Sequence, residues 1–187
     1  MTSPPAVLRN PLVLSLTLDK STQTFLTNLR SKYFPPSGNH FTAHLTLFRA
    51  IPPNRYPDLN RDLETLCQNP GFDVYIGEPR RRGYLVRVLV RETPSGSIEK
   101  IHRELLKSLR KGEGVGEGVG ENEGGKGELM ERDSKPLLGP HVTVTNRAKD
   151  VDEVERCLDE VKEVFEGIRK PGQVVGQKVG RAVGFEL

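Results

Sequence analysis

Two of the four histidines in this chain occur in the same short frame: histidine, apolar residue, threonine, apolar residue. The copies are HLTL, with His44 and Thr46, and HVTV, with His141 and Thr143. Because alternate side chains of a β-strand share one face, each copy is predicted to present an imidazole and a hydroxyl side by side, with its apolar residues facing a core. A lone strand histidine is usually structural, but two copies, each followed by a helix, favour a functional pair.

These four side chains could together carry out acid–base chemistry on a phosphate. At an ordinary pKa of about 6.5, one histidine can accept a proton from an attacking water or hydroxyl while the other delivers a proton to a leaving oxygen. The threonine hydroxyls can donate to non-bridging phosphoryl oxygens, where negative charge accumulates in the transition state. This set suits metal-independent phosphodiester chemistry, especially on a strained cyclic phosphate. Which histidine is the base and which ribose oxygen leaves stay open.

The two motifs lie 97 positions apart and, with their flanks FTAHLTLF and GPHVTV, resemble those of the 2H phosphoesterase superfamily. That superfamily includes 2′-5′ RNA ligase-like proteins and cyclic phosphodiesterases. The resemblance covers most of the chain and implies a bilobal, pseudo-symmetric α+β fold with a central cleft. It also implies catalytic roles for His44 and His141, with Thr46 and Thr143 holding the phosphate.

From these observations we expect an enzyme of RNA processing, a metal-independent phosphodiesterase that needs no cofactor. Its substrate would be a 2′,3′-cyclic phosphate on an RNA end or nucleotide, or ADP-ribose 1″,2″-cyclic phosphate, as the resemblance implies. The alternatives are 2′-5′ RNA ligation, which is the reverse sense of the same exchange, and a non-catalytic RNA-binding module. We expect a monomer with no obligate protein partner and no membrane association.

Weaker candidates for substrate binding lie outside the two motifs. Arginines crowd around Tyr84, at positions 80, 81, 82, 87 and 91, and this stretch could steer RNA while the tyrosine ring stacks on a base. Such a run is more often a solvated hairpin. Arg147, just past the second motif, is a similar candidate. His102 is in register with apolar helix positions, which favours a place in the core, and His40 is expected in a loop.

The elements that must position the motifs follow from the apolar pattern. Leucines with period two predict a strand at 12–18, and the first motif predicts another at 42–48. A helical period predicts helices at about 21–33, 55–69, 98–109 and 150–166. Further strands are expected at 72–77 and 83–91, joined by a turn at EPRRRG, then at 141–146, and as a last strand or hairpin at 174–187.

This order predicts an α+β fold: a bilobal pseudo-twofold arrangement with mainly antiparallel sheets flanking a central cleft and helices on the outside. An α/β fold stays open as an alternative. We expect one domain over residues 1–187, interrupted at 111–128 by a flexible insertion rich in Gly and Glu. The insertion holds eight of the nineteen glycines and a net charge of −3, so the rest of the +3 chain carries +6.

Composition excludes several other classes. Two cysteines, Cys67 and Cys157, are too few and too far apart for a disulfide framework or a short metal motif. The segment 120–126 fits a phosphate-loop frame, but Gly127 stands where Ser or Thr is required and no strand leads in. No apolar run approaches the roughly 20 residues that span a bilayer. We expect a cytoplasmic or nuclear protein.

Overall fold

The computed structural model describes residues 10–34, 41–68, 71–111, 129–137, 139–146, 148–168 and 178–186. Nearly all of the expected insertion, together with His40, Arg147 and the phosphate-loop frame, lies outside these residues. Within them the order of elements is α+β, as predicted: β1 (Leu12–Leu18), α1 (Lys20–Ser31), β2 (Leu45–Ile51), a 3₁₀ turn (Pro53–Arg55), α2 (Tyr56–Cys67), β3 (Phe72–Arg82), β4 (Leu85–Thr93), α3 (Ser97–Lys111), β5 (His141–Thr145), α4 (Val151–Gly167) and β6 (Lys178–Glu186).

The chain is an internal duplication of a β-α-β-α-β unit. The first repeat runs from β1 to β3, and the second from β4 to β6. Every strand pairing in the described residues is antiparallel, which excludes the α/β alternative for this part of the chain. The strands hydrogen-bond in the order β1-β2-β5-β4-β3-β6, and β6 returns to β1. Two three-stranded lobes result, β6-β1-β2 and β3-β4-β5, and each repeat gives its last strand to the other repeat's lobe.

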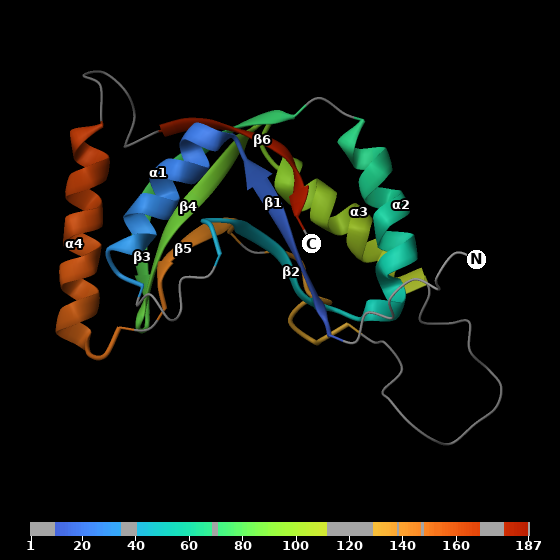
Figure 1. Ribbon diagram of the computed structural model, residues 1–187, viewed down its shortest axis with the longest axis horizontal. Helices are drawn as coiled ribbons and strands as arrows, with labels where there is room; N and C mark the ends of the chain where they lie inside the picture. The colour runs from blue at the N-terminus through green and yellow to red at the C-terminus, as the bar shows by residue number, and fades with distance from the viewer. Residues whose placement is uncertain are drawn as a thin grey trace, which may run out of the picture.

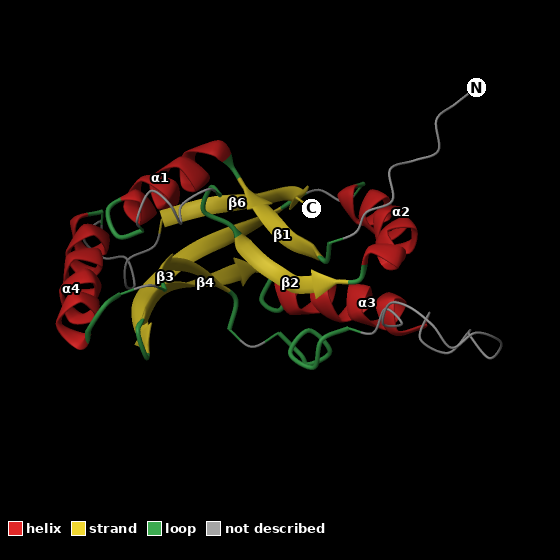
Figure 2. Ribbon diagram, turned by 60° about the horizontal axis from the view of Figure 1, so that its bottom comes forward, coloured by secondary structure: helices red, strands yellow, loops and turns green. Residues whose placement is uncertain are grey.

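The helices lie outside the strands, as predicted. In Figure 1, α1 and α4 cover one end of the molecule while α2 and α3 cover the other, and Figure 2 shows the same division from a second direction. The edge-on contact of Phe25 with Phe165, at 5.8 Å between ring centroids, joins α1 to α4. Asp19 caps α1 by accepting from the backbone N–H of Ser21 and Thr22, each at 3.1 Å, and Asp150 caps α4 through Glu153 at 2.8 Å.

Two expected boundaries were wrong. β2 begins at Leu45 rather than residue 42 and continues to Ile51. The segment EPRRR is not a turn: β3 continues through it to Arg82, and the hairpin turns at Gly83 and Tyr84. A bulge between Ile76 and Pro79 absorbs the proline without ending the strand. Gly83 then has φ +59°, which suits the first position of a two-residue loop.

The core and the last strand are closer to what the apolar pattern of the sequence predicts. His102 is 2% exposed and its ring stacks on Phe48 at 4.4 Å, so its expected place in the core is confirmed. β6 is a single strand, and the earlier residues of the expected tail lie outside the described part. No helix among the described residues combines the length and the apolar character needed to cross a lipid bilayer.

Candidate active site

The two motifs meet at one of the two junctions between the lobes, where β2 pairs with β5, while β3 pairs with β6 at the other. β2 and β5 share a single residue pair, Leu45 with Val142, and both side chains are fully buried. The residues on either side of this pair therefore face away from the core, because strand side chains alternate. Antiparallel pairing places His44 opposite Thr143 and Thr46 opposite His141. An approximate twofold axis therefore passes between Leu45 and Val142. One join between strands thus positions two imidazoles and two hydroxyls.

A pocket of about 260 Å³ lies over this join. The structure brings all four motif residues into its lining. The remaining lining residues come from β1, from the end of α1 and the segment that follows it, and from the positions just past the two motifs: Val13, Arg30, Phe34, Phe41, Arg49 and Asn146. A volume of this size suits a nucleotide-sized group rather than a buried macromolecule.

Both histidines are anchored in the same way. Nδ1 of His44 lies 2.8 Å from the carbonyl oxygen of Thr42, and Nδ1 of His141 lies 2.9 Å from that of Gly139. Since a carbonyl oxygen can only accept a hydrogen bond, Nδ1 carries the proton in each ring. Nε2 is then the nitrogen that exchanges a proton with a bound molecule.

The surroundings of His141 disfavour its charged form. Burial is the largest cause that lowers its pKa, and Arg87, Arg49 and Arg82 lower it further, while the hydrogen bond to Gly139 acts in the opposite direction. His141 is therefore neutral at pH 7, with an unprotonated Nε2.

Sequence reasoning missed all six lining residues outside the two motifs, and two of them, Arg49 and Asn146, are placed in the same way. Each motif strand carries a β-bulge directly after its threonine: two residues of β2 face one of β1, and two residues of β5 face one of β4. The bulges bury adjacent residues, Leu47 with Phe48 and Val144 with Thr145. The alternation is thereby shifted by one, and the fifth residue after each histidine turns toward the pocket. Arg49 and Asn146 are thus equivalent under the twofold relation.

The rim of the pocket is partly cationic and partly apolar. Nη1 of Arg30 donates to the carbonyl of Thr42 at 3.1 Å, its guanidinium lies 4.6 Å from the centroid of the Phe34 ring, and burial lowers its pKa. Phe41 is 71% exposed at the rim, with its ring edge-on to that of His44. An exposed aromatic ring at the rim of this pocket can stack on a nucleobase.

The other sequence candidates fare differently. Tyr84 lies in the β3–β4 turn, 55% exposed, and does not line the pocket. Arg147 lies outside the described residues, and its neighbour Asn146 takes the position equivalent to Arg49. Among the described side chains, no three of His, Cys, Asp or Glu gather as a metal ion would require.

A duplicated α+β fold with two His-x-Thr pairs across one cleft defines the class of two-histidine phosphoesterases. The family model of the 2′-5′ RNA ligase superfamily matches residues 18–170, and the chain belongs to this family. The match confirms the resemblance to the 2H phosphoesterases. No curated protein matches the chain at a significant level.

Proposed function

We propose that the protein is a phosphodiesterase that opens a cyclic phosphate by two-histidine acid–base catalysis. The observation that carries the proposal is the arrangement at the Leu45–Val142 pair: two histidines, each with Nδ1 held by a backbone carbonyl, and two threonines, all lining one pocket. A proton acceptor, a proton donor and two hydroxyl donors supply what hydrolysis of a phosphodiester needs. The proposed substrates are a 2′,3′-cyclic phosphate on an RNA end or nucleotide, or ADP-ribose 1″,2″-cyclic phosphate.

The lowered pKa of His141 supports a division of roles. His141, neutral at pH 7, accepts a proton from water as the water oxygen bonds to phosphorus. The bond from phosphorus to one ribose oxygen breaks, and His44 delivers a proton to that oxygen. Thr46, Thr143 and Arg49 donate to the non-bridging oxygens. The product is a phosphomonoester with a free neighbouring hydroxyl, and proton exchange with solvent restores both rings.

The family match supports 2′-5′ RNA ligation as a second candidate. In that reaction a ribose hydroxyl replaces water as the nucleophile, and the same two histidines serve. Incubation with one RNA end that bears a 2′,3′-cyclic phosphate and another that bears a 5′-hydroxyl distinguishes the two, because ligation lengthens the RNA while hydrolysis leaves its length unchanged.

The proposal is tested by hydrolysis of nucleoside 2′,3′-cyclic monophosphates in EDTA. His44→Ala and His141→Ala are each expected to lower kcat about 10²–10⁴-fold, the usual contribution of a general acid or base. Circular dichroism and thermal unfolding establish that the variants fold. The position of the product phosphate identifies the leaving oxygen. Variants that hydrolyse the substrate as fast as the parent would refute the proposal, and the absence of turnover on every cyclic substrate would favour the RNA-binding alternative.

A further inference from the structure

The arginine stretch of the β3–β4 hairpin is divided between two faces. In the register of the hairpin, Arg80 pairs with Arg87 and Arg82 pairs with Leu85. Val86 and Val88 are fully buried, so Arg87 between them faces the opposite side. Paired residues on neighbouring strands share a face, and so do residues two apart. Arg80, Arg82 and Arg87 therefore lie on one face, and we call these three residues the arginine row.

This face is the one that carries the second catalytic pair. Arg87 pairs with Thr143 across β4 and β5, while Val142 and Val144 on either side of Thr143 are fully buried. Thr143, Arg87 and Arg80 thus form a line across three strands, spaced about 4.8 Å apart from strand to strand. Arg82 and Arg87 are also close enough to lower the pKa of His141, which supports this placement independently.

The guanidinium groups of the row have few partners. Nε of Arg87 is buried and has no hydrogen-bond partner among the described residues. Arg80 has one ion pair, 3.4 Å from Glu78, with both side chains about half exposed. Such an exposed pair contributes little and yields readily to a phosphate.

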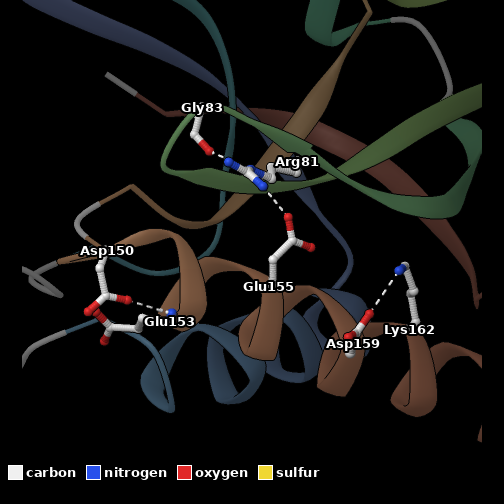
Figure 3. Close-up of polar contacts among 7 residues, drawn as sticks. All are labelled: Arg81, Gly83, Asp150, Glu153, Glu155, Asp159 and Lys162. Atoms are coloured by element: carbon white, nitrogen blue, oxygen red, sulfur yellow. Dashed lines mark hydrogen bonds and ion pairs between the residues drawn. The ribbon is translucent and has the colours of Figure 1, made fainter.

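Arg81 faces the other side and fixes the hairpin. Its side chain forms an ion pair with Glu155 of α4, and its Nε donates to the carbonyl of Gly83 at 2.9 Å (Figure 3). The hairpin tip is thereby tied to a helix, while its neighbours Arg80 and Arg82 stay on the face that continues from the pocket. The row is thus presented by an anchored hairpin.

The matching position on the other side of the pocket is not basic. Under the twofold relation Thr46 corresponds to Thr143, and the residue paired with Thr46 is Ser15 of β1. Near it lie the exposed apolar side chains of Val13 and Phe41. The catalytic residues are symmetric, but the surfaces beside them differ: cationic over β3 and β4, apolar near β1.

We propose that the arginine row is a binding surface for the phosphates of a single-stranded RNA whose cyclic end occupies the pocket. The inference rests on the proposed function and deepens it: the substrate is an oligonucleotide, and its chain leaves the pocket over β4 and β3. The terminal base lies on the apolar side, at Phe41. Guanidinium groups suit this role because their N–H groups match phosphate oxygens in pairs.

The test compares substrates of increasing length that end in the same 2′,3′-cyclic phosphate, from mononucleotide to tetranucleotide. For the parent enzyme, kcat/KM is expected to rise with each of the first added phosphates. The logarithm of affinity for a single strand falls with the logarithm of salt concentration, with a slope near −0.7 per phosphate contact. Two contacts should therefore lower the advantage of the longer substrate, its kcat/KM relative to that of the mononucleotide, about sevenfold between 50 and 200 mM salt. The variant Arg80→Gln/Arg82→Gln should lose the advantage, and Arg80→Lys/Arg82→Lys should restore much of it.

A control removes two exposed positive charges from α3, as Arg103→Gln/Lys107→Gln, and should keep the full length dependence. Equal kcat/KM for the mononucleotide and the longer substrates, or equal behaviour of the two glutamine variants, would overturn the inference. Fluorescence anisotropy with a tetranucleotide that ends in a 3′-phosphate tests the row separately from turnover. Weaker binding by the Arg80/Arg82 variant alone supports the surface even if no substrate is cleaved. Unchanged binding overturns the inference, and an acidic protein surface then becomes the candidate partner of the arginine row.

Discussion

At the scale of residues, the two histidines of the pocket occupy equivalent positions. Both histidines are held through Nδ1 by the carbonyl two residues earlier in the chain. Burial is the largest cause that lowers the pKa of His141, and three arginines lower it further. A base must be unprotonated at the working pH, so an environment that disfavours an imidazolium at His141 supports its proposed role as the base at neutral pH.

The lowered pKa of His141 predicts a pH profile for the proposed reaction. Because the pKa of His141 lies below 6.5, the acid limb of the profile, where kcat/KM for a cyclic mononucleotide declines, should lie below that pH. Arg87→Gln removes a neighbouring positive charge, which raises the pKa of His141, so the acid limb should move to higher pH. The pH dependence of kcat/KM measures both effects, since a phosphodiester does not titrate near neutrality.

Arg82→Gln provides a second variant at an exposed position, and Arg103→Gln on α3 is a control that should leave the acid limb in place. If the limb stays where it is in both hairpin variants, or moves to lower pH, His141 is not the residue that titrates.

The pocket residues that the sequence predicts and those that it misses differ in what determines the direction of their side chains. The motif residues were found because a His-x-Thr frame needs only the local period of a strand, and Leu45 and Val142 show the expected burial. Arg49 was missed because strict alternation would bury it. The bulge that exposes it arises from pairing with β1, a contact distant in sequence. Asn146 was missed for the same reason. The turn expected over EPRRRG was placed too early, because β3 bulges between Ile76 and Pro79 and continues to Arg82, so that only Gly83 of that segment lies in the turn.

At the scale of elements, a single carboxylate holds β2 just past its bulge. Oδ2 of Asp133 accepts from the backbone N–H of Arg49 at 3.0 Å and of Ala50 at 2.8 Å, and Asp133 is 5% exposed. Its negative charge also raises the pKa of the buried His102 against the larger lowering by burial. The turn that carries Asp133 therefore fixes the backbone from which Arg49 reaches the pocket.

Removing this acceptor should destabilise the fold. Asp133→Ala leaves two backbone donors without a partner in a buried place, at roughly 1–3 kcal/mol each. We expect the free energy of unfolding to fall by about 2 kcal/mol or more, as measured by urea denaturation. Asp133→Asn keeps an acceptor oxygen and should lose less. Equal losses in the two variants would show that the charge, rather than the acceptor, is what β2 needs.

At the scale of the whole molecule, each repeat contributes one His-x-Thr pair to the pocket. His44 and Thr46 come from the first repeat and His141 and Thr143 from the second, and the single Leu45–Val142 pair joins them. The lobes also exchange strands, because β3 of the first repeat pairs with β4 while β6 of the second pairs with β1. This is the geometry of a strand-swapped dimer whose two subunits are joined through one tight turn, at Gly83 and Tyr84.

Such a chain should behave as two interlocked halves when it is cut. Fragments 1–83 and 84–187 each lack the strand that completes a sheet, so neither should unfold cooperatively alone. Mixed in equal amounts, they should complement each other and recover hydrolysis, since each supplies one histidine. Activity in the mixture would then report reassembly directly, and a fragment that folds alone would show that strand exchange is dispensable for its own repeat.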